Sequence, residues 1–231
     1  DALPDPDGNL VMQAARDMAD AFGISEGAHL TLFKNLPVAS GIGGGSADAA
    51  AAMRALMRPW QINPEDGKIG KIALSLGADV PVCLISRPAV MRGVGEDLSL
   101  IPAFPELPMI LVNPGVGVST PTVFKARHGD FSRPVDWTAN GGGTEAQATV
   151  LAALQQTAND LQAPAITLTP VIGEVLAALG EQAGARLVRM SGSGATCFAL
   201  FDDDSAAHAA AHAIADAHPG WWVQAAQIYA T

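Results

Sequence analysis

Glycine is concentrated in one short part of the sequence. The segment Gly41-Ile42-Gly43-Gly44-Gly45 holds four glycines in five positions, and Ser46-Ala47 opens an alanine-rich run directly after it. Glycine lets a backbone approach a ligand closely. A helix, expected over 46–57, would also point its unpaired N–H groups and its positive dipole end toward the loop. The pattern therefore predicts a local binding site for an anion such as phosphate.

Other glycine-rich phosphate loops fit this segment less well. A P-loop closes with Gly-Lys-Ser/Thr, which this segment lacks. A dinucleotide-binding fingerprint needs a final glycine where Ser46 stands, and a parallel βαβ unit around it. A flexible turn that leads into a helix is the alternative without a function. Pro37 before the loop and a well-formed helix after it weaken that alternative.

A carboxylate stands in Gly77-Ala78-Asp79-Val80-Pro81, between an expected helix and a strand expected over 80–85. Phosphorylation of an alcohol needs a group that orients the hydroxyl and can accept its proton, and a positioned aspartate can do both. An aspartate at such a junction is more often a cap or a turn residue. Asp79 is thus either a general base or a cap or turn residue, and the residues on either side of it in the sequence bear on that choice.

Composition and charge limit the functions that are open to the chain. With 231 residues and 49% apolar residues it has the composition of a folded globular protein of one large domain or two. The net charge of −10 and only 13 scattered Lys and Arg argue against a broad nucleic-acid surface. No apolar run approaches the roughly 20 residues that span a bilayer. A phosphate ligand must therefore be held by backbone N–H groups and a metal ion.

The cysteines and histidines give no separate chemical signal. Cys83 and Cys197 lie far apart and outside any paired-ligand spacing, so we expect buried thiols of a cytosolic protein. His208 and His212 share a helix face, but no third ligand accompanies them, which favours a solvated face. The acidic, polar start at residues 1–9 does not resemble a signal peptide.

The remaining pattern predicts the elements that position these residues. Thr169 is expected to cap a helix with Pro170 in its first position. Three prolines between residues 101 and 108 suggest a domain boundary, and the part beyond it mixes helices with an antiparallel sheet. The expected helices cover 10–22, 46–57, about 64–76, 120–125, 144–157, 169–181 and 204–217; the expected strands cover 28–33, 80–85, 89–91, 109–112, 186–190, 196–201 and 221–226.

The glycine loop resembles the ATP-binding motif of the GHMP kinases, Pro-x-x-x-Gly-Leu-Gly-x-x-Ser, with Ile42 for the usual Leu and Ala47 where Ser is common. The resemblance implies that Pro37 and residues 41–47 bind ATP and that Asn9 lies near the adenine. Gly-Ala-Asp-Val-Pro is similar to the segment that carries the catalytic aspartate of these kinases, which implies Asp79 as the general base.

Two further segments resemble the same family. Ser191-Gly192-Ser193-Gly194 resembles its third motif, a glycine-rich turn that packs against the ATP loop and helps shape the site; it could also be a tight hairpin and nothing more. Thr120, Pro121 and Phe124 match a segment from which one branch takes a Thr, a Pro and a stacking Phe for a cytidine. Without the resemblance, a place in the core would be the better prediction for Phe124.

The resemblance implies an α+β fold of two domains. Residues 1–100 would be an ATP-binding domain like domain 2 of ribosomal protein S5, and residues 101–231 a ferredoxin-like domain. The implied activity is the ATP- and Mg²⁺-dependent phosphorylation of a small molecule that carries a cytidine diphosphate group, in non-mevalonate isoprenoid biosynthesis, with Ser46 as a candidate metal ligand. A cytoplasmic monomer or homodimer without nucleic-acid or membrane partners is expected.

Two alternatives stay open at this point. The chain could be a homoserine or mevalonate-type kinase of the same superfamily, although the Gly-Ala-Asp-Val-Pro and Thr-Pro-x-x-Phe segments argue against it. It could also be a nucleotide-binding module without catalysis. Family members begin a few tens of residues earlier, with a Lys-x-Asn motif and a Tyr-His pair. We therefore expect a piece of a longer reading frame, with an open sheet edge where the first strands are missing.

Overall fold

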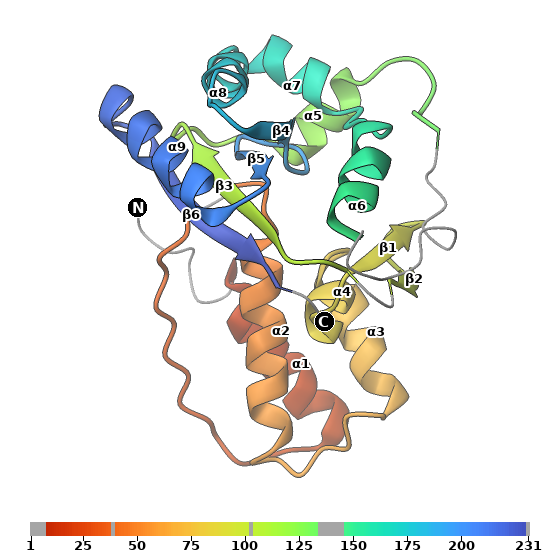
Figure 1. Cartoon of the computed structure of the whole chain (residues 1–231). Helices are drawn as coiled ribbons and strands as arrows, with labels where there is room; N and C mark the ends of the chain where they lie inside the picture. The colour runs from red at the N-terminus through yellow and green to blue at the C-terminus, as the bar shows by residue number, and fades with distance from the viewer. Residues whose placement is uncertain (1–7, 38–39, 102–103, 134–145, 230–231) are drawn as a thin grey trace. The chain divides into compact units, whose positions relative to one another are not determined.

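The computed structural model describes residues 8–37, 40–101, 104–133 and 146–229 (Figure 1). The chain forms two compact units, of which the first comprises residues 1–38 and 43–101 and the second residues 39–42 and 102–231. The glycine-rich loop therefore contributes to both units, because the division falls between Ile42 and Gly43.

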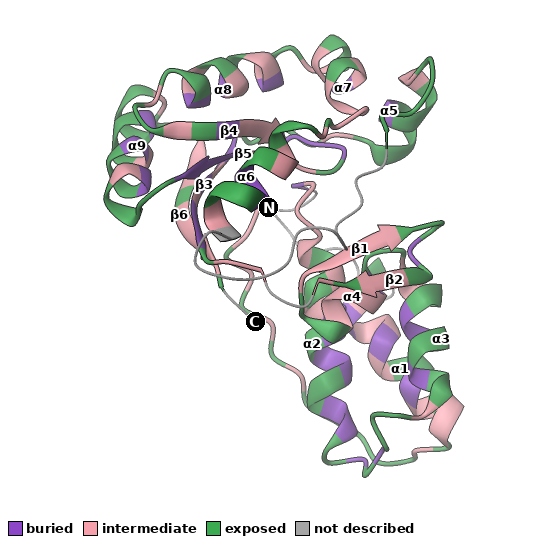
Figure 2. Ribbon diagram, turned by 45° about the vertical axis from the view of Figure 1, so that its right-hand side comes forward, coloured by how far each residue is buried: buried purple, intermediate pink, exposed green. Residues whose placement is uncertain are grey.

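Four helices form the core of the first unit: α1 (Leu10–Phe22), α2 (Gly44–Met57), α3 (Gly67–Leu76) and α4 (Val80–Ile85). On α1 the buried side chains recur at helical spacing, with Val11, Ala14 and Met18 on one face. Ala14 and Met18 belong to one buried cluster with residues of α2 that include Met53 and Leu56. Figure 2 shows these buried stretches along α1 and α2. Their packing fixes the direction in which the start of α2 points within this unit.

A β-hairpin completes the first unit, formed by the antiparallel strands β1 (Ala89–Arg92) and β2 (Asp97–Leu100). The carboxylate of Glu96 accepts a hydrogen bond of 2.6 Å from the backbone N–H of Val94 inside the turn. At Gly95 φ is +100°, and a Cβ atom there would lie 2.3 Å from the carbonyl oxygen of Ala78. The turn therefore packs tightly against the residue that precedes Asp79, and glycine is required for it.

The second unit is built on a four-stranded antiparallel sheet. Its strands are β3 (Leu107–Asn113), β4 (Ala185–Met190), β5 (Cys197–Phe201) and β6 (Trp222–Ile228), in the spatial order β4-β5-β3-β6. Helices connect β3 to β4 and β5 to β6, while β4 and β5 follow one another directly. This order and these connections give the ferredoxin-like arrangement that the sequence led us to expect.

Helices cover both faces of this sheet. Along β5, the side chains of Cys197, Ala199 and Phe201 join one buried cluster with α8 and α9, whereas Leu200 joins Val150 on α6 in another. The alternation follows the two-residue period of a strand. The helices of this unit are α5 (Thr120–Ala126), α6 (Ala146–Gln155), α7 (Gln162–Leu168), α8 (Val171–Gly180) and α9 (Asp204–Ala217). No helix in the described ranges is long and apolar enough to cross a membrane.

Two of the expected strands are wrong. Residues 28–33 alternate like a strand, but the structure leaves them without regular structure, and 84% of the Phe33 side-chain surface is exposed. A strand needs a neighbour for its N–H and C=O groups, and no described strand pairs with this segment. Residues 80–85 form helix α4 instead of a strand, with Pro81 in the first turn, where the missing N–H is harmless.

Other differences concern element limits and two short elements. The α2 helix begins at Gly44 and not at Ser46, and α3 begins at Gly67, after Asp66 as its cap, rather than near Pro64. Pro170, one residue later than expected, is the cap of α8. Strand β2 and helix α7 were not predicted. Helices α1 and α9 have the predicted limits.

Candidate functional site

The start of α2 is open to an anion. Gly43 is the N-cap residue with φ +67°, and no side chain caps the helix. The N–H groups of the first three helical residues, Gly44, Gly45 and Ser46, have no partner within the helix, as in any first turn. The Ser46 hydroxyl makes no hydrogen bond with another described residue. Donor groups and the positive end of the helix dipole therefore coincide here.

A lysine that we did not single out from the sequence lies beside this helix start. The Nζ atom of Lys34 is 2.5 Å from Oδ2 of Asp48, and it lies 3.4 Å from the position that a Cβ atom would take on Gly44. A cation near a helix N-terminus is unfavourable by itself, and the carboxylate of Asp48 offsets that cost. The available signal was a lysine three residues before Pro37, in a chain with only 13 basic residues.

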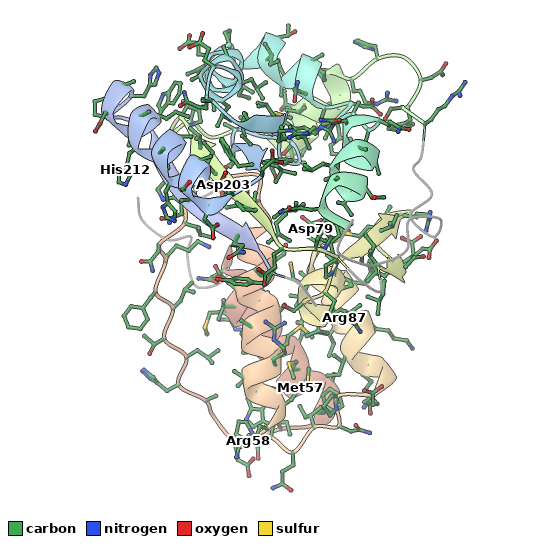
Figure 3. All side chains as sticks on the ribbon, viewed as in Figure 1. Met57, Arg58, Asp79, Arg87, Asp203 and His212 are labelled. Carbon is green, nitrogen blue, oxygen red and sulfur yellow. The ribbon has the colours of Figure 1, made fainter. Side chains whose placement is uncertain are left out.

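Asp79 faces the cap of α2 within the same unit. Its Oδ2 atom lies 3.8 Å from the Cβ position of Gly43. Asp79 is itself the N-cap residue of α4, yet its side chain makes no capping hydrogen bond and is exposed. Figure 3 labels Asp79 at the start of this helix. The carboxylate is therefore free to interact with a ligand, although a helix and not the expected strand follows it.

An arginine on α2 holds α4 in place. Nη1 of Arg54 donates to the carbonyl oxygens of Cys83 at 2.7 Å and Leu84 at 3.2 Å, which satisfies two acceptors in the last turn of α4. The same contacts bring charge to the Cys83 thiol. Burial raises its pKa first, the Asp79 carboxylate raises it further, and Arg54 lowers it. The thiol of Cys83 therefore reports on the charge of Asp79.

The third glycine-rich motif packs against the first part of the glycine loop, inside the second unit. The Ser191 hydroxyl donates to the carbonyl oxygen of Gly41 at 3.0 Å, and the Thr196 N–H donates to that of Ser40 at 3.1 Å. At Gly41, φ is +74°, and a Cβ atom would lie 2.2 Å from the carbonyl oxygen of Gly194. Glycine at position 41 is thus required both by its backbone angle and by this close approach.

Polar contacts join the third motif to the start of α5 and to the end of β3. The Thr120 and Ser193 hydroxyl oxygens are 2.7 Å apart and share a hydrogen bond. Nδ2 of Asn113 donates to the hydroxyl of Thr196 at 2.8 Å, and both residues are buried at the end of the central strand β3. These bonds hold the segment that carries Thr120 and Pro121 at a fixed place beside the third motif.

Phe124 is not a core residue, so that alternative is wrong. On α5, 54% of its side chain is exposed, and it lines a cavity of about 450 Å³ in the second unit.

Asn9 caps α1, with Oδ1 accepting a hydrogen bond of 3.0 Å from the N–H of Val11. Pro37 and Ile42 are half-buried. The structure thus gathers Gly43 to Ala47 with Asp79 in one unit, and Gly41 with Thr120 and the third motif in the other.

One side-chain oxygen in the first turn of α2 could bind a metal ion that phosphates also bind. In the described part of the chain, no group of three or more His, Cys, Asp or Glu side chains could hold a metal ion. Mg²⁺ often takes only one or two protein ligands and completes its shell with water and phosphate oxygens. The uncommitted hydroxyl of Ser46, in the first turn of α2, suits such an ion.

Comparisons with known proteins give the family of the chain. The family model for the GHMP kinases N terminal domain matches residues 9–87, and the model for GHMP kinases C terminal matches residues 145–220. A 4-diphosphocytidyl-2-C-methyl-D-erythritol kinase of Paramagnetospirillum magneticum is 52% identical over 96% of this chain and 78% of its own length. One of the same name from Rhodospirillum rubrum is 46% identical over 96% of this chain and 72% of its own length.

Solved structures give a similar result. A crystal structure of 4-(cytidine 5'-diphospho)-2C-methyl-D-erythritol kinase matches with a TM-score of 0.75 and 34% identity, covering 97% of this chain and 80% of that one. Homoserine kinase from Cytophaga hutchinsonii also has a TM-score of 0.75, at 21% identity over 98% of this chain and 78% of its own. At that identity the second match supports the fold alone.

The charge on Asp79 can be tested through the Cys83 thiol. Replacing Asp79 by Asn removes a charge that raises the pKa of this thiol, so more thiolate is present at pH 8. We expect iodoacetamide to modify Cys83 roughly two to five times faster in Asp79→Asn, as followed by peptide mass spectrometry. Cys197 serves as the internal control, because burial raises its pKa to about 12. Equal Cys83 rates in both proteins would contradict the proximity of the two groups.

The packing of the glycine loop can be tested with two glycine variants. Gly23 and Gly41 both have positive φ, but a Cβ atom on Gly23 meets nothing within 4 Å. Gly23→Ala should cost about 1 kcal/mol of unfolding free energy. Gly41→Ala adds a clash with the Gly194 carbonyl and should cost at least about 1 kcal/mol more. Urea denaturation followed by circular dichroism measures both. Equal losses would show that Gly41 is not packed against the third motif.

Proposed function

Because this chain belongs to the GHMP kinases, we propose that it transfers a phosphoryl group from ATP to the 2-hydroxyl of 4-diphosphocytidyl-2-C-methyl-D-erythritol, as the name of its relatives suggests. The chain is a phosphotransferase by this membership. One observation carries the assignment of the reaction centre: an uncommitted carboxylate, that of Asp79, lies 3.8 Å from the Cβ position of the residue that caps an open helix start.

The start of α2 is proposed to hold the phosphates of ATP. The free N–H groups of Gly44, Gly45 and Ser46 point toward the site where an anion would sit, and the ammonium group of Lys34, paired with Asp48, lies beside them. Charge-assisted hydrogen bonds of this kind are stronger than neutral ones, and they need no broad basic surface. The ATP site as proposed comprises Asn9, Pro37 and residues 41–47.

Asp79 is proposed to orient the acceptor hydroxyl and to take its proton. The hydroxyl oxygen forms a bond to the γ-phosphorus while the bond to the β,γ-bridging oxygen breaks, and ADP leaves. The proton of the hydroxyl goes to Oδ2 of Asp79. The protein contributes positioning and fixed charge, with no covalent intermediate.

Mg²⁺ is proposed to bind at this site with Ser46 as a ligand. When bound, the ion offsets the negative charge of the phosphate oxygens. The support is the chemistry of the donors: the Ser46 hydroxyl has no other partner in the described residues, and it lies in the same helical turn as the free N–H groups. Gly43 and Gly44 have no side chains that could cover the start of α2, so the site stays accessible.

The second unit is proposed to bind the cytidine part of the substrate. Phe124 offers an exposed ring for stacking, and Thr120 and Pro121 begin the same helix. The Ser191–Gly194 turn supports this place through the hydrogen bond between Ser193 and Thr120. We further propose that residues 1–100 form the ATP-binding domain and 101–231 the second domain, and that the enzyme acts in the cytoplasm, in the non-mevalonate route to isoprenoids.

Removal of the Asp79 charge tests the proposed base. Asp79→Asn should lower kcat by about 10²- to 10⁴-fold, because the variant cannot accept the proton. The Asp79 side chain is exposed and caps nothing, so the melting temperature should stay unchanged. ADP release from Mg-ATP in the presence of the substrate measures the rate.

Asp97→Asn is the matched control for this test. Asp97 is an exposed aspartate at the start of β2 and loses the same charge without touching the start of α2. It should keep kcat within about twofold. An Asp79→Asn enzyme that keeps more than a tenth of the wild-type kcat would rule out Asp79 as the base.

A further inference from the structure

The cavity beside Phe124 contains features that the proposed function does not yet use. It lies entirely within the second unit and has a volume of about 450 Å³, within the usual range for ligand pockets. Besides Phe124, its lining includes Phe131 and Arg127. Phe131 is 71% exposed. Two exposed phenylalanines around one cavity make a surface that suits a flat aromatic ligand.

Side-chain hydrogen bonds fix the wall that carries Phe131. Oδ2 of Asp160 accepts from both the N–H and the hydroxyl of Ser132, at 2.8 and 3.0 Å, directly after Phe131. Nδ2 of the neighbouring Asn159 donates to the carbonyl oxygens of Met190 and Gly192, at 2.8 Å each. The segment with Phe131 is therefore tied through residues 159–160 to the third motif, which in turn bonds to Thr120.

The cavity lining holds two arginines, and they differ in how many of their N–H groups are already used. Arg189 donates to the carbonyl oxygens of Leu154 and Thr157 and to the Thr157 hydroxyl, so its guanidinium is largely used. Arg127 makes one hydrogen bond, from Nη1 to the carbonyl oxygen of Asp130 at 3.2 Å. Its Cζ atom lies 3.7 Å from the centre of the Phe131 ring.

We propose that Arg127, stacked on Phe131, binds the diphosphate of the cytidine-containing substrate, while Phe124 stacks on the base. The proposal rests on the proposed function, because it assigns a residue to the substrate named there. It makes Arg127 a specificity residue that distinguishes a nucleoside diphosphate from a bare nucleoside.

Two physical features favour this role for Arg127, and one neighbouring charge opposes it. The guanidinium fork matches the oxygens of a phosphate, and stacking on an aromatic ring fixes the plane of the fork before the ligand arrives. The half-buried position of Arg127 reduces screening by water. The carboxylate of Asp160 also lines the cavity and would repel a diphosphate, but both hydrogens of Ser132 already bind its Oδ2. Of the two arginines in the lining, Arg127 has more N–H groups left for an anion.

Calorimetric titration of the whole chain with CDP and with cytidine tests the proposal without any need for turnover. Arg127→Gln should weaken CDP binding by about tenfold and leave cytidine binding within about twofold. Arg127→Lys keeps the charge but loses the planar fork and its stacking, so it should weaken CDP binding by an intermediate factor of about three to five. Arg133→Gln is the control for charge alone, since Arg133 is exposed nearby but does not line the cavity. It should leave both affinities within about twofold.

Several results would overturn the proposal. Equal weakening of CDP binding by Arg127→Gln and Arg133→Gln would show a general effect of charge. Equal weakening of CDP and cytidine by Arg127→Gln would show a loss of cavity structure. A wild-type chain that phosphorylates the substrate, while Arg127→Gln binds CDP as wild type does, would refute this inference and leave the proposed function intact. Failure of the wild-type chain to bind CDP would refute both.

Discussion

In a chain with a net charge of −10, the backbone must supply much of the positive potential that a polyphosphate such as ATP needs. The first turn of α2 does so, because its N–H groups are left without partners and no side chain caps them. Most helices begin at a residue such as Ser or Asp, whose side chain would occupy these donors. The cap here is Gly43, which has no side chain to offer. The glycines thus leave the N–H groups of the first turn accessible, and they also allow the chain to turn there.

The surroundings of this helix start follow from the same constraint. Lys34 and Asp48 form an ion pair beside the positive end of α2, and the carboxylate offsets the unfavourable interaction of the lysine with the helix dipole. Arg54, further along α2, binds the last carbonyl groups of α4, and α4 in turn carries Asp79 at its first end. One helix therefore carries the proposed anion site at its start and contacts, through a residue near its end, the helix that begins at Asp79.

The local conformation of the glycine loop was largely predictable, since it depends on local sequence. Glycines at 41 and 43 have positive φ, and the alanine-rich helix follows them as expected. The prediction of a strand over 80–85 was wrong because the apolar run Val80–Ile85 fits a strand or a helix equally well. Pro81 and the contact with Arg54 favour the helix. Lys34 was missed because its relation to Asp48 depends on two segments that pack only in the folded chain. The periodicity of apolar residues predicts helices and strands, but it does not predict a contact between two such segments.

The central claim is that this site phosphorylates the 2-hydroxyl of a cytidine-diphosphate-linked alcohol rather than another small molecule. The fold alone does not decide this, since structures of a kinase for that alcohol and of a homoserine kinase match it equally well, each with a TM-score of 0.75. The most direct test is ³¹P NMR of the products formed from Mg-ATP with 4-diphosphocytidyl-2-C-methyl-D-erythritol, homoserine or mevalonate. The account predicts a new phosphomonoester signal with the first compound only, coupled to the carbon that bears the 2-hydroxyl. A phosphomonoester from homoserine or mevalonate, with none from the first compound, would contradict it.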